Sequence, residues 1–365
     1  MSARISENHH DVKSSKPHAA DDSQTVFNFS TPGTVTKFTV QETGLYSIEA
    51  IGGAGGTGNA RTGSSRDEAV GGLGAQVVAT FDLTSGDVLT VVVAAQGGNS
   101  RETIGPAGGG GATLVIGPDD LLVVAGGGGG GAVGGNEAQS RGTDAGPDQD
   151  ATSGKSATFG IGQTVAGGAA GSNGGGGQGG TYAGNGDGYG GGGSGGYLVN
   201  GGDGTIPANA GGGGGSLGNL DLAGGTGGAG NGGAGGFGGG GGGGYLGGGG
   251  GGGGYNGGGG GPAVDNVGGG GGAGGSFVSS NAISSGYDTA SARGNGSVVL
   301  TLLDNGLEGP SVVDWNALAA RVTANFEATG HWFLDPVSYD EKTTDWNALA
   351  AQVTANYNAS GHWYL

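Results

Sequence analysis

The sequence predicts a mainly β protein, a β-sandwich or barrel that is interrupted by a bundle of glycine-rich helices and followed by two short helical repeats. Three observations lead to this fold class. Short apolar-alternating stretches occur between Thr25 and Ala125 and again between Ser276 and Leu303. Glycine is concentrated between Gly108 and Gly275, and a 21-residue segment that begins at Asp314 recurs at Asp345.

The β region contains stretches with the alternation and turn punctuation of strands. The predicted strands are Val26–Phe29, Val35–Val40, Leu45–Ile51, Ala75–Leu83, Val88–Ala94, Ala112–Ile116, Leu121–Ala125, Ser276–Ser279 and Ser297–Leu303. Because side chains alternate between the faces of a strand, each stretch has one predicted core face. These faces are Phe38/Val40, Tyr46/Ile48/Ala50, Val77/Ala79/Phe81/Leu83 and Leu89/Val91/Val93.

The glycine region is predicted as one large insertion at about 126–275. Glycine makes up 103 of 365 residues, about four times its usual share of ~7%. A strict Gly-X-Y period is missing and only nine prolines occur, which excludes collagen. Two readings remain, a flexible linker and an ordered bundle of polyproline II-type helices whose bare Cα atoms let backbones touch. Interspersed tyrosines would cap or separate such helices, namely Tyr182, Tyr189, Tyr197, Tyr245 and Tyr255.

Charge and composition restrict the function. The formal net charge is -18 with only 12 Lys and Arg, which argues against nucleic acid and anionic membrane surfaces. No cysteine is present, so disulfide scaffolds and thiol catalysis are excluded. The segment 1–23 is predicted as a disordered polar arm without the apolar stretch of a signal peptide. We expect a protein that does not span a membrane and that reaches the cell surface or the exterior by a route without an N-terminal signal peptide.

The C-terminal part is predicted as a linker, 304–313, followed by two repeats, 314–334 and 345–365, with 16 of 21 positions identical. Asp314 and Asp345 are predicted N-caps, and each repeat reads as a helix followed by an extended segment. Exposed aromatic residues make good interface anchors, and the extended ends are suited to adding to a sheet edge. The candidate interaction residues are Trp315, Phe326, His331, Trp332, Phe333, Trp346, Tyr357, His362, Trp363 and Tyr364.

No motif indicates catalysis or a bound cofactor. The segment Ala151–Ser156 resembles the end of a phosphate-binding loop, but Gln149 occupies the position of its first glycine and no helical pattern follows. Gly184–Gly188 hints at a calcium-binding repeat, but its aspartate is out of register. We therefore predict a non-enzymatic protein without a cofactor, and calcium at an acidic loop stays open as an alternative.

The order of strands and glycine runs resembles the glycine-rich extracellular domain of the anaplastic lymphoma kinase and leukocyte tyrosine kinase receptors and its bacterial relatives. The resemblance covers about residues 25–303 of a predicted glycine-rich β-sandwich domain, 24–303. The segments that carry it include Thr43–Gly56, Gly72–Leu83, Ser85–Gly98, Gly108–Ile116, Val123–Gly131, Gly274–Val278 and Gly294–Leu300. It implies a TNF-like β-sandwich with an inserted bundle of glycine helices. In the receptors this domain helps to recognise a protein ligand outside the cell. This chain lacks their cysteines, membrane span and kinase, so receptor signalling is not implied.

The leading functional hypothesis is a secreted or cell-surface structural and adhesion protein. Loops such as Gly56–Ala69 and Ala132–Ser156 would present the recognition surface, and the C-terminal repeats would serve anchoring, assembly or export. Expected partners are a protein or glycan on a cell surface or further copies of the chain, with a homo-oligomer as the expected state. The alternatives are a phage tail-tip adhesin, which shares the physics of glycine helices, and a hydrolase acting on surface polymers.

Overall fold

The computed structural model describes residues 25–304, except 63–64, 135, 147–149, 161, 185–186 and 207–208. The chain divides into two compact units, Met1–Leu303 and Asp304–Leu365. The predicted arm, the linker after residue 304 and both C-terminal repeats lie outside the described residues. Within them the protein is mainly β, as predicted, and the described residues include one short helix, α1 (Glu137–Ser140).

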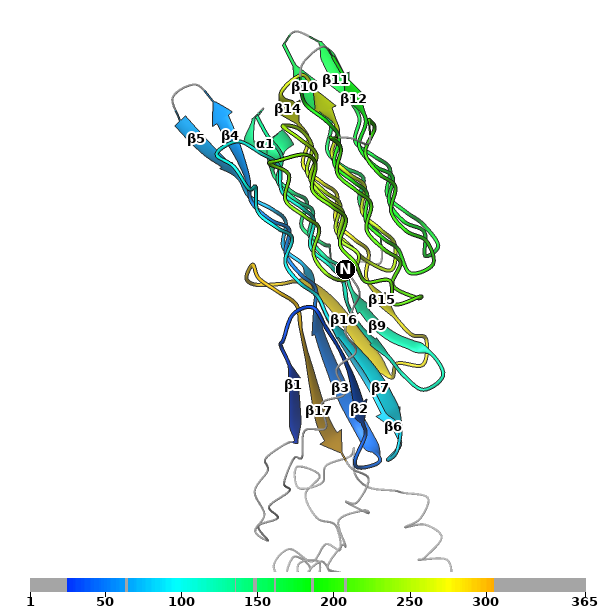
Figure 1. Ribbon diagram of the computed structural model, residues 1–365. Helices are drawn as coiled ribbons and strands as arrows, with labels where there is room; N and C mark the ends of the chain where they lie inside the picture. Colours follow the sequence, from blue (N-terminus) through cyan, green and yellow to red (C-terminus); the bar gives the residue numbers. More distant parts are fainter. Residues whose placement is uncertain are drawn as a thin grey trace, which may run out of the picture. The chain divides into compact units, whose positions relative to one another are not determined.

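Two five-stranded sheets form the lower part of the first unit in Figure 1. The first sheet has the order β1 (Val26–Phe29), β17 (Ser297–Asp304), β3 (Gly44–Ile51), β6 (Ala75–Leu83), β16 (Ser284–Thr289). The second has the order β15 (Phe277–Val278), β9 (Leu121–Ala125), β8 (Thr113–Ile116), β7 (Val88–Val93), β2 (Thr34–Thr39). Neighbours in the second sheet pair antiparallel throughout.

One hydrophobic core is shared by the two sheets. Tyr46 and Ile48 of β3 and Val77 of β6 lie in the same cluster as Leu89 of β7 and Val123 of β9, and all five are buried. The predicted core faces of these strands are confirmed, with Phe38 packed against the cluster as a partly buried side chain. Period-two alternation identified them because each strand has one face toward this core.

All nine predicted strands are present, and the described residues contain eight further strands and α1 that were not predicted. β16 pairs along β6 from Ser284↔Thr80 to Thr289↔Ala75, yet its sequence SSGYDT has no apolar alternation because it forms an exposed sheet edge. The segment Gly56–Ala69, predicted as a loop, contains the hairpin of β4 (Gly58–Thr62) and β5 (Ser65–Ala69). The two strands pair through their backbones and have mostly polar or charged side chains, so they show no apolar alternation from which they could be predicted.

Short strands and α1 lie at the end of the glycine segments that points away from the two sheets (Figure 1). They comprise the hairpin of β10 (Ala157–Phe159) with β11 (Gln163–Val165), and the group of β12 (Tyr182–Ala183), β13 (Ala263–Val264) and β14 (Val267–Gly268). The hairpin β4–β5 lies at the same end (Figure 1). The glycine segments therefore join two structured ends.

The glycine segments are held by backbone hydrogen bonds that repeat every three residues. In segment 248–254 each N–H donates to a carbonyl of another segment, at 2.9–3.4 Å. Every third N–H donates to the same neighbouring segment, so successive residues bond to three different neighbours in turn. The donor and acceptor pairs are Gly248–Tyr189, Gly251–Gly192 and Gly254–Gly195, then Gly249–Gly269 and Gly252–Gly272, then Gly250–Ala107 and Gly253–Gly110.

This network extends beyond the predicted insertion at about 126–275. The N–H of Gly53 donates to Gly111, that of Gly55 to Gly72, and that of Gly110 to Gly128. Glycines that directly follow or precede the sheet strands thus belong to the same network. The glycine region and the sheets are therefore continuous. The prediction of one separate insertion at about 126–275 was too narrow, because glycines before residue 126 take part in the same hydrogen bonds.

Candidate recognition surfaces

The ten aromatic and histidine residues predicted as interaction sites, from Trp315 to Tyr364, lie outside the described residues. Their role stays a prediction. The two predicted recognition loops, in contrast, are largely described, and they are the starting point for the surfaces of the first unit.

The glycine network brings the two predicted loops to one end of the unit (Figure 1). The N–H of Gly131 donates to Gly56 at 3.1 Å, and the N–H of Gly142 donates to Val70 at 3.0 Å. Gly56 leads into the β4–β5 hairpin and Gly142 follows α1 closely. Loops that are far apart in the sequence therefore form one end surface.

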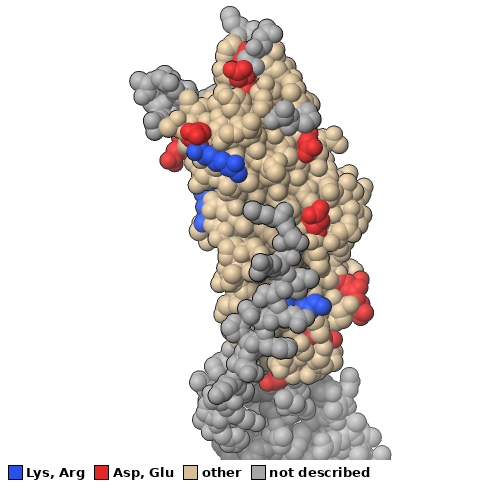
Figure 2. All heavy atoms as spheres, viewed as in Figure 1, with Lys and Arg blue, Asp and Glu red and all other residues tan. Residues whose placement is uncertain are grey.

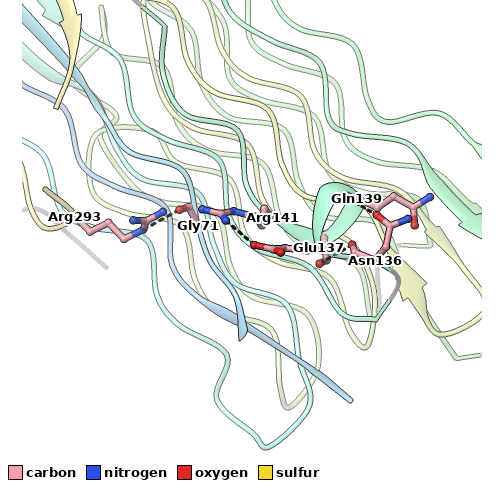
Figure 3. Close-up of polar contacts among 7 residues, drawn as sticks. Gly71, Asn136, Glu137, Gln139, Arg141 and Arg293 are labelled. Carbon is pink, nitrogen blue, oxygen red and sulfur yellow. Dashed lines mark hydrogen bonds and ion pairs between the residues drawn. The ribbon is translucent and has the colours of Figure 1, made fainter. Parts of the chain in front are cut away.

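Three basic residues lie on segments around Gly71, between this end and the sheets, and Arg293 belongs to the loop that joins β16 to β17. Arg141, which follows α1, donates through Nη1 to Oε1 of Glu137 at 2.7 Å, and this pair is exposed. Arg293 donates through Nε to the carbonyl of Gly71 at 3.1 Å. Figure 3 shows both arginine side chains reaching toward Gly71. The N–H of Lys155 donates to Gly270, and the N–H of Gly270 donates to Gln139, which places Lys155 one segment away from Arg141.

Lys155 is in an unfavourable electrostatic position. Burial lowers the pKa of its ammonium group, the neighbouring Arg141 lowers it further, and Asp144 opposes the shift. Asp144 is itself engaged, because its Oδ1 accepts a hydrogen bond from the N–H of Leu73 at 2.7 Å. Figure 2 shows basic groups gathered near the α1 end of the visible face, beside acidic ones.

An exposed apolar surface lies on turns of the glycine region. Leu198 is 61% exposed, Val199 56% and Leu220 42%. Their two turns are joined, because the N–H of Gly218 donates to the carbonyl of Tyr197 at 2.7 Å. Leu220 has a φ of 53°, a conformation that is unfavourable for a branched side chain. Sequence analysis missed this surface, since single apolar residues between glycines show no periodicity.

The tyrosines of the glycine region stack in two groups where glycine runs end. Tyr189 stacks on Tyr182 with ring centroids 5.6 Å apart and contacts Tyr245 at 6.1 Å. Tyr255 lies between Tyr197 at 5.7 Å and Phe277 of β15 at 4.6 Å. The second group continues into a buried cluster with Leu217 and Leu114.

Of the two doubtful motifs, Ala151–Ser156 is described, whereas residues 185–186 of Gly184–Gly188 lie outside the described residues. In Ala151–Ser156 the N–H groups of Thr152, Gly154 and Lys155 donate to Ala273, Gly168 and Gly270, so these donors are already used within the glycine network. Among the described residues no group of three or more potential ligands is arranged to hold a metal ion. The described part of the chain also contains no helix with the length and apolar character of a membrane span.

The chain matches no model of a known protein family. A search of curated proteins likewise returns no match.

Proposed function

We propose that this chain is a non-enzymatic structural and adhesion protein whose glycine-rich head presents recognition surfaces at the ends of a stiff scaffold. The observation that carries this proposal is the three-residue repeat of the hydrogen bonds. Three residues per turn is the period of a polyproline II helix. We infer that the glycine segments are such helices, packed side by side and continuous with a TNF-like sandwich of the two sheets.

A flexible linker is the competing view of the glycine region, and the contacts argue against it. Ordering each residue costs about 1–2 kcal/mol of backbone entropy, and glycine has no side chain to bury in return. In segment 248–254 the hydrogen bonds run to three neighbours, and every glycine of this segment is buried. Backbone contacts with three neighbours therefore hold this segment in one conformation, which favours a scaffold with a fixed shape over a flexible linker.

The proposed partners are a protein or glycan on a cell surface, or further copies of the chain. This part of the proposal draws on the resemblance to receptor glycine-rich domains and on the joined loops at the α1 end. The C-terminal repeats would anchor, assemble or export the protein, and the head would remain outside the cell.

The test is localisation of the full chain and of a truncation that ends at Pro310, in cytosol, envelope and medium of producing cells. We expect full-length protein on the surface or in the medium. We expect folded but unattached or retained protein for the truncation, because the repeats would be gone while the head stays intact. Finding both forms in the cytosol would overturn the extracellular assignment.

A phage tail-tip adhesin is the second candidate, favoured by the exposed apolar turns with Leu198, Val199 and Leu220. Loops often carry function, and a strained residue such as Leu220 is consistent with a binding role. This candidate predicts a trimer in solution, and light scattering on the purified chain measures its mass. A monomer would contradict the phage tail-tip candidate, and the surface-protein proposal would then be the one that remains.

A further inference from the structure

We propose that Arg141, Lys155 and Arg293 form a binding site for an anionic polysaccharide, a polymer that carries carboxylate or sulfate groups. This inference rests on the proposed adhesion function and names the ligand class for the surface around Gly71. We call these three residues the basic row.

The basic row is assembled from three separate parts of the chain. Gly142, next to Arg141, donates to Val70, and Arg293 donates to the next carbonyl along, that of Gly71. On the other side, Lys155 and Arg141 are joined through the segment at Gly270. Figure 3 shows Arg141 and Arg293 on either side of Gly71. Backbone hydrogen bonds thus hold Arg141 and Lys155 in place, and the side chain of Arg293 is held at Gly71.

The charges of the basic row are only partly compensated by the protein. Arg141 forms an exposed ion pair with Glu137, and exposed ion pairs contribute little to stability. Lys155 and Arg293 have no ion pair within the part of the chain that the structure describes. Burial is the main cost to the charge of Lys155, repulsion by Arg141 adds to it, and Asp144 offsets part of it. An external anion would relieve this cost, and perturbed charged groups of this kind are common at functional sites.

The surroundings favour a polysaccharide over an acidic protein segment. Protein interfaces are dominated by buried aromatic and apolar anchors. The exposed apolar turns of Leu198, Val199 and Leu220 belong to other segments, and Val70 and Leu73 beside the row are partly buried. Arg141 and Arg293 are at least partly exposed, so the row is open to a chain that passes over it. Repeated anions on one polymer would bind the three cations together more tightly than single anions.

The experiment measures binding of the full chain to immobilised polygalacturonate and dextran sulfate at low and moderate salt, with neutral dextran as the blank. We expect binding that weakens as salt rises and that falls about two- to fivefold in each of Arg141→Gln, Lys155→Gln and Arg293→Gln. Comparison of the two polymers separates carboxylate from sulfate as the preferred group.

Three controls keep the result specific. Lys37→Gln removes the same charge from β2, in the second sheet, and should leave binding unchanged. Glu137→Gln removes a carboxylate that competes for Arg141, so it should tighten binding, an effect that loss of folding cannot produce. Lys155→Gln should also preserve or raise the thermal midpoint, since it removes an unfavourable charge.

The proposal is overturned if neither polymer binds more than neutral dextran, or if Lys37→Gln weakens binding as much as the row variants do. Polyglutamate is tested in the same assay. If it binds and neither polysaccharide does, the result overturns the proposal in favour of an acidic protein partner. The localisation test is independent: a head that binds polygalacturonate but stays in the cytosol would refute the adhesion function and not the site.

Discussion

At the scale of single residues, the glycine segments depend on the missing Cβ atom. A Cβ built on Gly252 would overlap the carbonyl of Gly127 in a neighbouring segment. The same residue donates to Gly272 at 2.9 Å and accepts a hydrogen bond from the buried hydroxyl of Ser194. Backbone cannot give way here as a flexible side chain would, so any substitution separates segments that hydrogen bonds hold together.

We predict that Gly252→Ala lowers the free energy of unfolding by about 1–3 kcal/mol or more, the range for overpacking a closely packed interior. The matched control is Gly286→Ala, because a Cβ on Gly286 in β16 meets no atom within 4 Å. The control should change stability by less than about 0.5 kcal/mol. Urea unfolding of both variants measures the difference, and equal stability would contradict tight packing at Gly252.

The buried tyrosine of β3 gives a second prediction. The Tyr46 hydroxyl donates to the carbonyl of Glu42 at 2.8 Å, and burial raises the pKa of this hydroxyl, with the Glu42 carboxylate adding to the rise. Above about pH 10 the unfolded chain therefore ionises first, and stability is lost as pH rises. Tyr46→Phe should cost about 1 kcal/mol at neutral pH.

The same variant should show a smaller loss of stability between about pH 9 and pH 11, because its side chain cannot ionise. Denaturant unfolding across this range compares the two proteins. Parallel pH profiles would mean that Tyr46 ionisation is not linked to folding.

At the scale of elements, the sheet strands and the glycine segments are stabilised differently. β6 buries alternate side chains in the shared core, and its pattern of buried and accessible positions alternates along its length. Segment 248–254 has no side chains, and its stability comes from hydrogen bonds to three neighbouring segments. Its order therefore depends on contacts with residues as distant as Ala107 and Gly272.

We predict that the amides of segment 248–254 exchange with deuterium as slowly as those of β6. Each of these N–H groups is hydrogen-bonded in a buried position, so exchange requires opening of the network. Hydrogen exchange followed by mass spectrometry measures this, with the denatured chain as the fully exchanging reference. Rapid exchange of the segment would support the linker view of the glycine region.

At the scale of the whole molecule, the acidic balance and the continuity of the first unit are the main features. A net charge of -18 favours solubility of a glycine-rich chain through mutual repulsion. Within the first unit, glycines next to the sheet strands, such as Gly53 and Gly110, belong to the network of the glycine segments. The sheets and the glycine region therefore share their stabilising contacts.

We predict that a fragment ending at Pro310 unfolds in one cooperative thermal transition. Loss of the glycine network would remove partners of Gly53 and Gly110, and loss of the sheets would release the ends of the glycine segments. Calorimetry followed by comparison of the calorimetric and van't Hoff enthalpies measures this. Two separate transitions would show that the glycine region folds independently.

The sequence by itself determined the mainly β class, the strands that face the core and the location of most of the glycine region. Tyr46, Ile48 and Val77 were recognisable because period-two alternation is local in the sequence. β16 and the β4–β5 hairpin were missed because backbone pairing leaves no such pattern.

Only the tertiary structure decided which segments each glycine contacts and which charges meet. A run of glycines carries no side-chain pattern, so its register is fixed by hydrogen bonds to distant segments, as for Gly252 and Gly272. Arg141 and Arg293 are far apart in the chain, and the segment at Gly71 brings them together. The physical reason is that composition and periodicity are local, whereas the contacts that make this network and its basic row join residues from separate parts of the sequence.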